Sequence, residues 1–289
     1  MPMNLKRRNE ILLTLPSMGW LIIFFLLPTV FVIAMAFRSA DPYGGIGDEW
    51  TLQTIKDLGN PNYPAIIWRT IWLSVVSTML CIIMAIPAGY YISRLQKRTQ
   101  DIVLLLVIVP FWTNFLIRIF AWKVFLHPEG AVKQILDMLH ITDPNSLLLY
   151  RPEAVLIVLV YTHLPFALLP IYAAAEKFDF SLMEAAFDLG ASRIQAFMRI
   201  FIPGIKQGLF TAIIIVFIPA LGSYIIPDIV GGPTGEMIGN KIAQRTFVDR
   251  NLPHASALSA ILTLVVILPV AIALTRRFFK EKNSGSIGI

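Results

Sequence analysis

The sequence has a single cysteine and few charged residues. Cys81 is the one cysteine among 289 residues, so no disulfide can form within the chain. The 4 histidines are scattered, and no cysteine or histidine pair has the spacing of a metal site. Charged residues make up 15% of the chain and hydrophobic residues 56%, and the mean hydropathy is +0.70. A chain of this composition is too apolar for the surface of a water-soluble globule, which indicates an integral membrane protein.

The sequence also lacks the motifs of an energy-converting enzyme. No phosphate-binding loop of the G-x-x-x-x-G-K-[ST] type is present, and Gly190-Ala191-Ser192 lacks the lysine that holds terminal phosphates in such loops. No Ser/His/Asp set indicates a nucleophile. We therefore expect no catalytic residues, no metal and no cofactor bound by this chain. ATP hydrolysis, if it powers this protein, must occur in another subunit.

Six apolar runs are long enough to cross a hydrocarbon core of about 30 Å, which takes about 20 residues. They predict an all-α, polytopic membrane protein in which residues 1–289 form one transmembrane domain. The first run contains Ala34-Met35-Ala36, which has the form of a signal-peptide cleavage site. Its apolar core is longer than the roughly 7–15 residues of a signal sequence, so we interpret it as a span. The predicted spans are Leu12–Phe37, Ile67–Ser93, Ile102–Leu126, Ala154–Ala175, Gly208–Val230 and Ala255–Thr275.

Basic residues concentrate in alternate connections between these runs. Lysine and arginine mark the cytoplasmic side of a membrane protein, so the pattern predicts that both termini are cytoplasmic. The opposite connections carry mainly acidic residues. The net charge of +6 therefore follows from topology and requires no nucleic-acid partner. Basic positions on the predicted inner face include Lys6, Arg94, Lys177, Arg199 and Arg276.

The longest predicted cytoplasmic connection covers residues 176–207 and predicts two short helices. Ser181 with Glu184, and Ser192 with Gln195, each have the spacing of a capping box, in which a serine and an acid or amide satisfy helix-end amides reciprocally. Gly190 lies between the two, where glycine permits a left-handed helix stop. The second helix is expected to carry one apolar stripe and to end at a proline; these residues are Ile194, Phe197, Met198, Phe201 and Pro203.

Two interpretations of this connection differ in what covers it. An amphipathic helix pair lying on lipid headgroups is expected to have a face rich in lysine and arginine. The first predicted helix instead has Asp179, Glu184 and Asp188, which anionic lipid repels. The acidic residues favour docking of a partner protein.

The same connection resembles the "EAA" loop of the permease subunits of bacterial ABC importers. Glutamate, two alanines, glycine, isoleucine and proline occur at the family spacing, with Ile202 where the family usually has leucine. In that family the first helix of the loop is a coupling helix that inserts into a groove on an ATPase subunit. The resemblance implies a type I (MetI-like) importer fold, with ATP and Mg bound by the partner ATPase. The docking residues that it implies are Glu184, Ala185, Ala186, Asp188, Gly190, Ile200 and Pro203.

A second resemblance covers nearly the whole chain. The segments Pro110–Arg118, Ile226–Pro233 and Met237–Asn240 are similar to the permeases of spermidine/putrescine importers. This resemblance implies alternating access by a pathway shared with a second homologous permease, two copies of an ATPase subunit, an extracytoplasmic solute-binding protein, and a place in the bacterial inner membrane. Another small solute, such as ferric iron or phosphonate, is the alternative, because related permeases share parts of this scaffold.

Asp228 is the first candidate for the solute pathway. A carboxylate at the outer end of the fifth predicted span is costly in lipid, so it is expected to face protein or water, where it can attract a polycation. The alternative is an interfacial residue that caps a helix end or pairs with Lys241 or Arg245.

Three further candidates come from rings and an amide. Trp112 and Tyr224 can offer ring faces to ammonium groups, and Asn114 can accept hydrogen bonds; aromatic residues in membrane helices also serve as packing or interface anchors. Arg118 is expected to pair inside the bundle and, as a cation, disfavours a polyamine nearby. His163 is expected to bond to a neighbouring helix.

The competing class of function is a stand-alone channel or an ion-gradient-driven carrier. Such a protein needs its own binding or proton-relay residues within the membrane, and many have internal inverted repeats. Acidic residues within the apolar runs are few, and no inverted repeat is evident. Both observations favour the importer subunit.

Overall fold

The computed structural model describes residues 5–60, 62–140 and 146–284. The chain divides into two compact units, one formed by Met1–Pro64 with Lys241–Ile289 and the other by Ala65–Asn240. Helices α4 (Asn62–Ser93) and α13 (Ile238–Ala243) each run across the border between the units.

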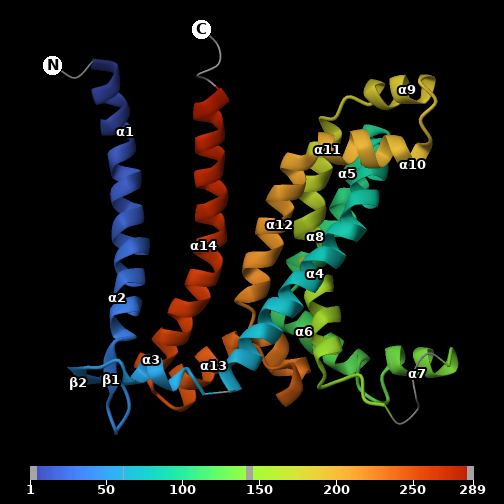
Figure 1. Ribbon diagram of the computed structural model, residues 1–289. Helices are drawn as coiled ribbons and strands as arrows, with labels where there is room; N and C mark the ends of the chain where they lie inside the picture. Colours follow the sequence, from blue (N-terminus) through green and yellow to red (C-terminus); the bar gives the residue numbers. More distant parts are fainter. Residues whose placement is uncertain (1–4, 61, 141–145, 285–289) are drawn as a thin grey trace. The chain divides into compact units, whose positions relative to one another are not determined.

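The first unit is built around a long N-terminal helix. Its segments α1 (Leu5–Leu21), the π-helical turn η1 (Ile22–Leu26) and α2 (Leu27–Met35) follow one another without a break. Residues Leu13–Met35 form a helix long and apolar enough to cross a membrane, and α2 packs against α14 (Leu252–Ser284). In Figure 1 the start of α1 and the end of α14 lie at the same end of this unit. These features agree with the first predicted span.

A short hairpin is the one non-helical element that the described residues add to the predicted helical fold. Strands β1 (Arg38–Ala40) and β2 (Ile46–Trp50) pair in antiparallel fashion, with Arg38 opposite Trp50. The connection contains Gly44 and Gly45 at φ +98° and +108°, a region that side-chain-bearing residues rarely adopt. The sequence prediction missed the strands because they are short and flanked by a long apolar run. Helix α3 (Gln53–Asp57) and the π-turn η6 (Gln244–Val248) complete this unit.

The second unit surrounds α8 (Pro152–Glu176), which packs along α12 (Lys206–Leu221). Figure 1 shows α9 and α10 across one end of these helices and α7 at the other. The remaining elements are α5 (Lys97–Ile108), the 3₁₀ turn η2 (Val109–Trp112), α6 (Phe115–Phe125), α7 (Ala131–Met138), α9 (Ser181–Asp188), α10 (Arg193–Ala196), the π-turn η3 (Phe197–Phe201), α11 (Ile202–Gly204), the π-turn η4 (Pro227–Gly231) and the 3₁₀ turn η5 (Pro233–Gly235).

Two of the predicted spans are not single helices. The helix from Lys97 to Trp112 and α6 meet at an angle of 90°, because Asn114 caps a new helix by accepting a hydrogen bond from the Leu116 amide at 2.8 Å. Helix α12 ends at Leu221, and the predicted remainder of that span is a loop followed by η4. Pro110 lies near the end of the first helix and Pro219 near the end of α12. Each contributes to the ending of its own helix, because proline removes a backbone donor.

In the described part of the chain, three helices are long and apolar enough to span, and five spans are reached if each bent pair counts as one. In the first unit, the apolar segment Leu252–Ile267 of α14 is shorter than these spans. The chain is therefore a polytopic helical membrane protein.

Close packing of α12 on α8 depends on glycine at position 208. A β-carbon there would lie 2.5 Å from the Ala174 Cβ and 2.6 Å from the Pro170 carbonyl oxygen. At Gly204 a β-carbon would lie 2.3 Å from Cε2 of Phe178. The two glycines have G-x-x-x-G spacing, and Gly208 marks the contact between α12 and α8.

Gly208→Ala is expected to destabilise the protein by about 1–3 kcal/mol, because a backbone carbonyl cannot move aside as a flexible side chain can. Thermal unfolding of the purified protein in detergent measures the loss. Gly222→Ala is the matched control, because its nearest neighbours to an added β-carbon lie 3.9 Å away. Equal melting temperatures for the two variants would contradict the close contact.

Candidate coupling loop and pathway cavity

Helix α9 is the first half of the predicted docking segment, and it divides into a buried and an exposed side. Met183 and Ala186 are buried against the core of the second unit. Glu184, Ala185 and Asp188 are exposed. One alanine of the EAA signature therefore anchors the helix, while the other alanine and both acids remain open to a partner.

The start of α9 differs from the predicted capping box. Ser181 is the first residue of the helix, and the residue at the N-cap position, Phe180, makes no capping hydrogen bond with its side chain. Instead, the carboxylate of Asp179 accepts a hydrogen bond from the Ser181 backbone amide at 3.0 Å. Hydrogen bonds from the Ser181 side chain and then its backbone lower the pKa of Asp179. Aspartate takes the capping role because its short carboxylate reaches the backbone amide two residues further on.

The joint between the two helices agrees with the sequence prediction. Gly190 has φ +84°, and its amide donates to the Phe187 carbonyl at 2.9 Å. The second capping box is present: the Ser192 amide donates to Gln195 Oε1 at 2.9 Å, and the Gln195 amide donates to Ser192 Oγ at 3.3 Å. The loop is therefore a well-defined turn between two helix ends.

The second helix places its apolar residues on two sides. Phe201 is buried and Phe197 half-buried, whereas Ile194 and Met198 are exposed at 76% and 57%. The predicted single stripe is wrong in this respect, because residues four apart form two neighbouring rows and the core covers one of them. The exposed row adds apolar surface beside α9.

The last two docking candidates lie near the end of this helix, just before the bend into α12. Ile200 is half-buried against the core and Pro203 is exposed. The helix ends at Gly204, and α12 begins at Lys206 after a bend of 70°. Pro203 thus lies inside a short helical turn and does not itself end the helix.

Five rings join the loop to the long helices. Tyr90 of α4 contacts Phe180, Phe197 and Phe201, with ring centroids 6.0, 5.3 and 4.9 Å away. Phe178, which follows α8, lies 5.3 Å from Phe201. We call these five residues the aromatic cluster. Edge-to-face pairs at such distances are favourable and specific in geometry, so the cluster holds the loop in a fixed position against α4.

A polar contact fastens the same end of the unit. Lys97 Nζ donates to Glu176 Oε1 at 2.8 Å, which connects the start of α5 to the end of α8. The Tyr172 hydroxyl donates to Gln100 Oε1 at 3.0 Å, and the Gln100 amide nitrogen donates to the Leu95 carbonyl at 2.9 Å. The bases of α4, α5 and α8 are therefore joined next to the loop.

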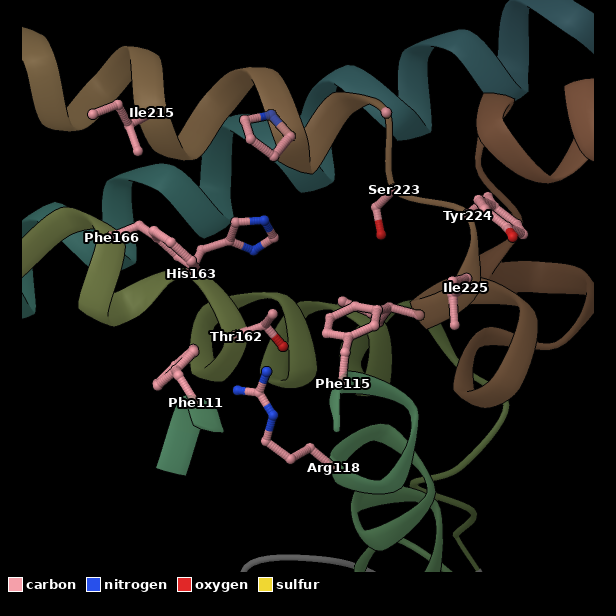
Figure 2. A pocket seen from close by; sticks show the side chains of 13 residues that line it. Phe111, Phe115, Arg118, Thr162, His163, Phe166, Ile215, Ser223, Tyr224 and Ile225 are labelled. Atoms are coloured by element: carbon pink, nitrogen blue, oxygen red, sulfur yellow. The ribbon is translucent and has the colours of Figure 1, made fainter. Parts of the chain in front are cut away.

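A cavity of about 430 Å³ lies between α6, α8, α12 and the loop after α12. Its wall is mainly apolar, with a few polar groups from α6, α8 and the loop, and Figure 2 shows their arrangement. Volume and lining are those of a small-molecule site. The lining residues are Phe111, Phe115, Arg118, Thr162, His163, Phe166, Ile215, Pro219, Gly222, Ser223, Tyr224, Ile225 and Ile226.

One of the four predicted pathway residues lines this cavity. Tyr224 does so, whereas Trp112, Asn114 and Asp228 do not. Trp112 is 78% exposed, and the Asn114 oxygen is used to cap α6. Asp228 is exposed on η4, and among the described residues no cation lies within ion-pair distance of it. The two proposed partners of Asp228 contact other residues: Lys241 donates to Gln244, and Arg245 pairs with Asp249.

The cavity brings together polar residues that the sequence analysis did not assign to one site. Arg118 was expected to pair inside the bundle, yet its Nε and Nη1 are buried without a hydrogen-bond partner in the described structure. His163 Nδ1 lies 2.8 Å from the Leu159 carbonyl of its own helix, so the expected bond to a neighbouring helix is wrong for this nitrogen. In the sequence, the signal for this site is the presence of polar residues near Pro110 and Gly222, which tend to break helices. The bend that brings these polar residues together is a tertiary feature.

Comparison with known proteins agrees with this architecture. Residues 5–282 match the family described as "Binding-protein-dependent transport system inner membrane component". The chain is 34% identical over 261 residues to the spermidine/putrescine transport system permease protein PotB of Salmonella typhimurium (strain SL1344), with 90% of each chain covered. It is 36% identical over 250 residues to PotB of Haemophilus influenzae (strain ATCC 51907 / DSM 11121 / KW20 / Rd), with 86% of this chain and 87% of that protein covered.

Similarity also extends to the fold of a solved transporter. A chain of the bacterial alginate ABC transporter, crystallised in complex with an alginate pentasaccharide-bound periplasmic protein, superimposes with a TM-score of 0.70 at 22% identity, over 94% of this chain and 96% of that one. The chain belongs to the family of binding-protein-dependent transport system inner membrane components. It is a multi-pass membrane component of an import system.

Gly190→Ala is expected to loosen the joint between α9 and α10. An alanine in the left-handed region costs roughly 1–2 kcal/mol, which corresponds to about a 5–30-fold rise in local opening. Nothing lies within 4 Å of an added β-carbon, so the effect is confined to the backbone. Gly190→Asn should therefore keep much of the stability of the joint, because asparagine tolerates the left-handed region better than alanine. Hydrogen exchange of the amides in 181–204 measures the change.

The matched control is Gly45→Ala, which combines a φ of +108° with open space in the other unit. It should leave exchange in 181–204 unchanged. If Gly190→Ala and Gly190→Asn accelerate exchange equally, the left-handed conformation is not what the joint requires.

Proposed function

We propose that this chain is a permease subunit of an ATP-driven ABC importer for polyamines, and that it receives the force of ATP hydrolysis through residues 176–207. A second, homologous permease completes the pathway, two ATPase subunits bind and hydrolyse ATP with Mg, and an extracytoplasmic binding protein delivers the solute. The loop and both termini face the cytoplasm. The pathway opens alternately to the two sides of the inner membrane.

The observation that carries the docking proposal is the exposed surface of the loop. Leu189 is 89% exposed and Leu182 52%, beside the acids Glu184 and Asp188. Acidic residues at this position are repelled by anionic lipid, and large exposed apolar residues rimmed by charge are typical of a protein interface. An ATPase groove with apolar walls and basic edges fits this surface.

The buried side of the loop supports transmission of the force. A push on α9 reaches Met183 and Ala186, which pack into the same core as Phe201. The aromatic cluster then carries the displacement to α4 through Tyr90, while α11 continues into α12 after one residue. Closely packed interiors move as rigid elements, so closure of two ATPase subunits would displace long helices and not merely the loop.

The polyamine assignment rests on the relatives at 34% and 36% identity, which are named for spermidine and putrescine. Phe166 and Tyr224 of the cavity present aromatic rings, and ring faces attract ammonium groups. Asp228 and Trp112 are exposed and remain candidates for an earlier contact with a cationic solute. Asn114 is the third such candidate, and its side-chain oxygen caps α6 after the bend. Ferric iron or phosphonate remains the second candidate solute.

Glu184→Lys is expected to lower ATP-dependent uptake at least tenfold, because it reverses charge on the proposed docking face. A tenfold loss corresponds to about 1.4 kcal/mol of docking or coupling free energy. Uptake by the reconstituted complex and co-purification of the ATPase measure it. Membrane abundance of the chain should not fall, since Glu184 is exposed.

Glu129→Lys is the control for this charge reversal, because Glu129 is also exposed but lies in the connection before α7, at the other end of the unit. It should transport normally. Normal transport by both variants would remove the docking role of α9.

Uptake of putrescine or spermidine into proteoliposomes is expected to require the ATPase, ATP and the cognate binding protein together. A stand-alone carrier would instead move solute without nucleotide, driven by an ion gradient. Radiolabelled uptake with each component omitted in turn separates the two classes. Retention of ferric iron or a phosphonate, and of no polyamine, by the cognate binding protein would replace the proposed solute and leave the importer role in place.

A further inference from the structure

The cavity beside α8 contains a cation without a counterion. Arg118 is placed there by the 90° bend before α6, and its Nε and Nη1 atoms are buried with no hydrogen-bond partner in the described residues. In Figure 2 its guanidinium points towards Thr162 and lies between Phe111 and Phe115. The distances from the guanidinium carbon to these two ring centroids are 4.4 and 5.9 Å. Ring faces stabilise the positive charge, but they do not satisfy the N–H donors.

The depth of this site makes the missing partner more significant. Thr162 and His163 lie near the middle of α8, a helix of 25 residues that is long enough to span the membrane. An arginine at such a depth normally faces another group of the protein or a water-filled cavity and pairs there. Buried donors that remain unpaired are costly, so an acceptor is expected to occupy this place at some stage of transport.

Among the described residues, the cavity wall does not supply a charged acceptor. None of the thirteen lining residues has a carboxylate. Asp228 is the acid of η4 in the same unit, and it is exposed and outside the lining. The planar guanidinium matches a carboxylate, which can accept two of its N–H groups at once. A carboxylate from outside the chain therefore fits the site best.

We propose that the Arg118 cavity receives an aspartate or glutamate side chain of the second permease subunit. The proposal rests on the proposed function, because it requires a second permease along the pathway. A polyamine carries ammonium groups and no carboxylate, so the solute cannot neutralise Arg118, and an unpaired guanidinium would repel it. A carboxylate from the second permease both satisfies the arginine and removes this repulsion.

Exposed apolar residues on and near the cavity-lining segments agree with a protein partner. Trp112 is 78% exposed next to Phe111, and Tyr224 is 44% exposed at the cavity edge. Ile117, next to Arg118 in the chain, is 66% exposed. Exposed aromatic and aliphatic residues close in the chain to an arginine have the composition of a protein–protein contact.

The test uses the assembled complex of both permeases and the ATPase in lipid nanodiscs. Arg118→Met keeps a long side chain and removes the charge and the donors; it should lower the melting temperature of the assembled complex and reduce polyamine uptake at least tenfold. Lys123→Met is the matched control on the same helix, because its ammonium lies 5.9 Å from the Tyr150 ring and outside the cavity lining. It should leave the melting temperature unchanged and change uptake by less than twofold.

A charge exchange identifies the partner residue. Arg118→Glu should prevent assembly of the complex, and changing one aspartate or glutamate of the second permease to arginine should restore assembly and uptake. Arg118→Lys, which keeps the charge but loses the planar fork, should be intermediate. Assembly is read by size-exclusion chromatography and does not depend on the solute, so a wrong assignment of the solute does not affect this result.

Three outcomes would overturn the proposal. Wild-type assembly and uptake with Arg118→Met would show that the guanidinium needs no acceptor. Failure of every single acid-to-arginine change in the second permease to rescue Arg118→Glu would exclude a pair between the subunits. Stabilisation of the wild-type complex, but not of Arg118→Met, by 4-aminobutyrate would assign the site to a carboxylate on a small solute instead.

Discussion

Close approach of neighbouring backbones to α8 is the constraint on which the second unit depends. Gly89 of α4, Gly208 of α12 and Gly231 of η4 all meet this helix at positions where an added β-carbon would lie under 3.0 Å from one of its atoms. In lipid the hydrophobic effect does not drive helices together, so dispersion contacts and small residues at the contact points have to do so. Because α8 is held in this way along its length, the loop at one end and the cavity near its middle share one rigid support.

If the loop docks an ATPase subunit, as proposed, this arrangement allows it to act on a distant pathway. Phe178, Phe180 and Phe201 belong to the loop and its approaches, while Tyr90 belongs to a helix 32 residues long. A displacement of α9 therefore cannot be absorbed locally without breaking ring contacts. The left-handed turn at Gly190 and the capping box at Ser192 keep the two short helices from shifting independently.

The cavity shows a different physical principle. Its apolar lining and its unpaired guanidinium are incompatible in an isolated subunit, since a buried cation needs an acceptor. The incompatibility disappears if the site is half of a larger structure. In the same way, exposed apolar residues such as Trp112, Ile117 and Leu189 are unfavourable in water but suited to lipid or to another subunit. What the single chain leaves unsatisfied thus indicates where it meets its surroundings.

Length, hydropathy and local chain chemistry were enough to predict much of this protein. Apolar runs predicted α8 and the helix from Leu13 to Met35, and local signals predicted the turn at Gly190 and the capping box at Ser192, because each depends on residues within a few positions of one another. The tertiary structure alone decided the 90° bend before α6, the close contact at Gly208, and the meeting of Arg118 with Thr162 and His163. These features arise between segments separated by tens of residues, and no local pattern specifies which helix faces will meet.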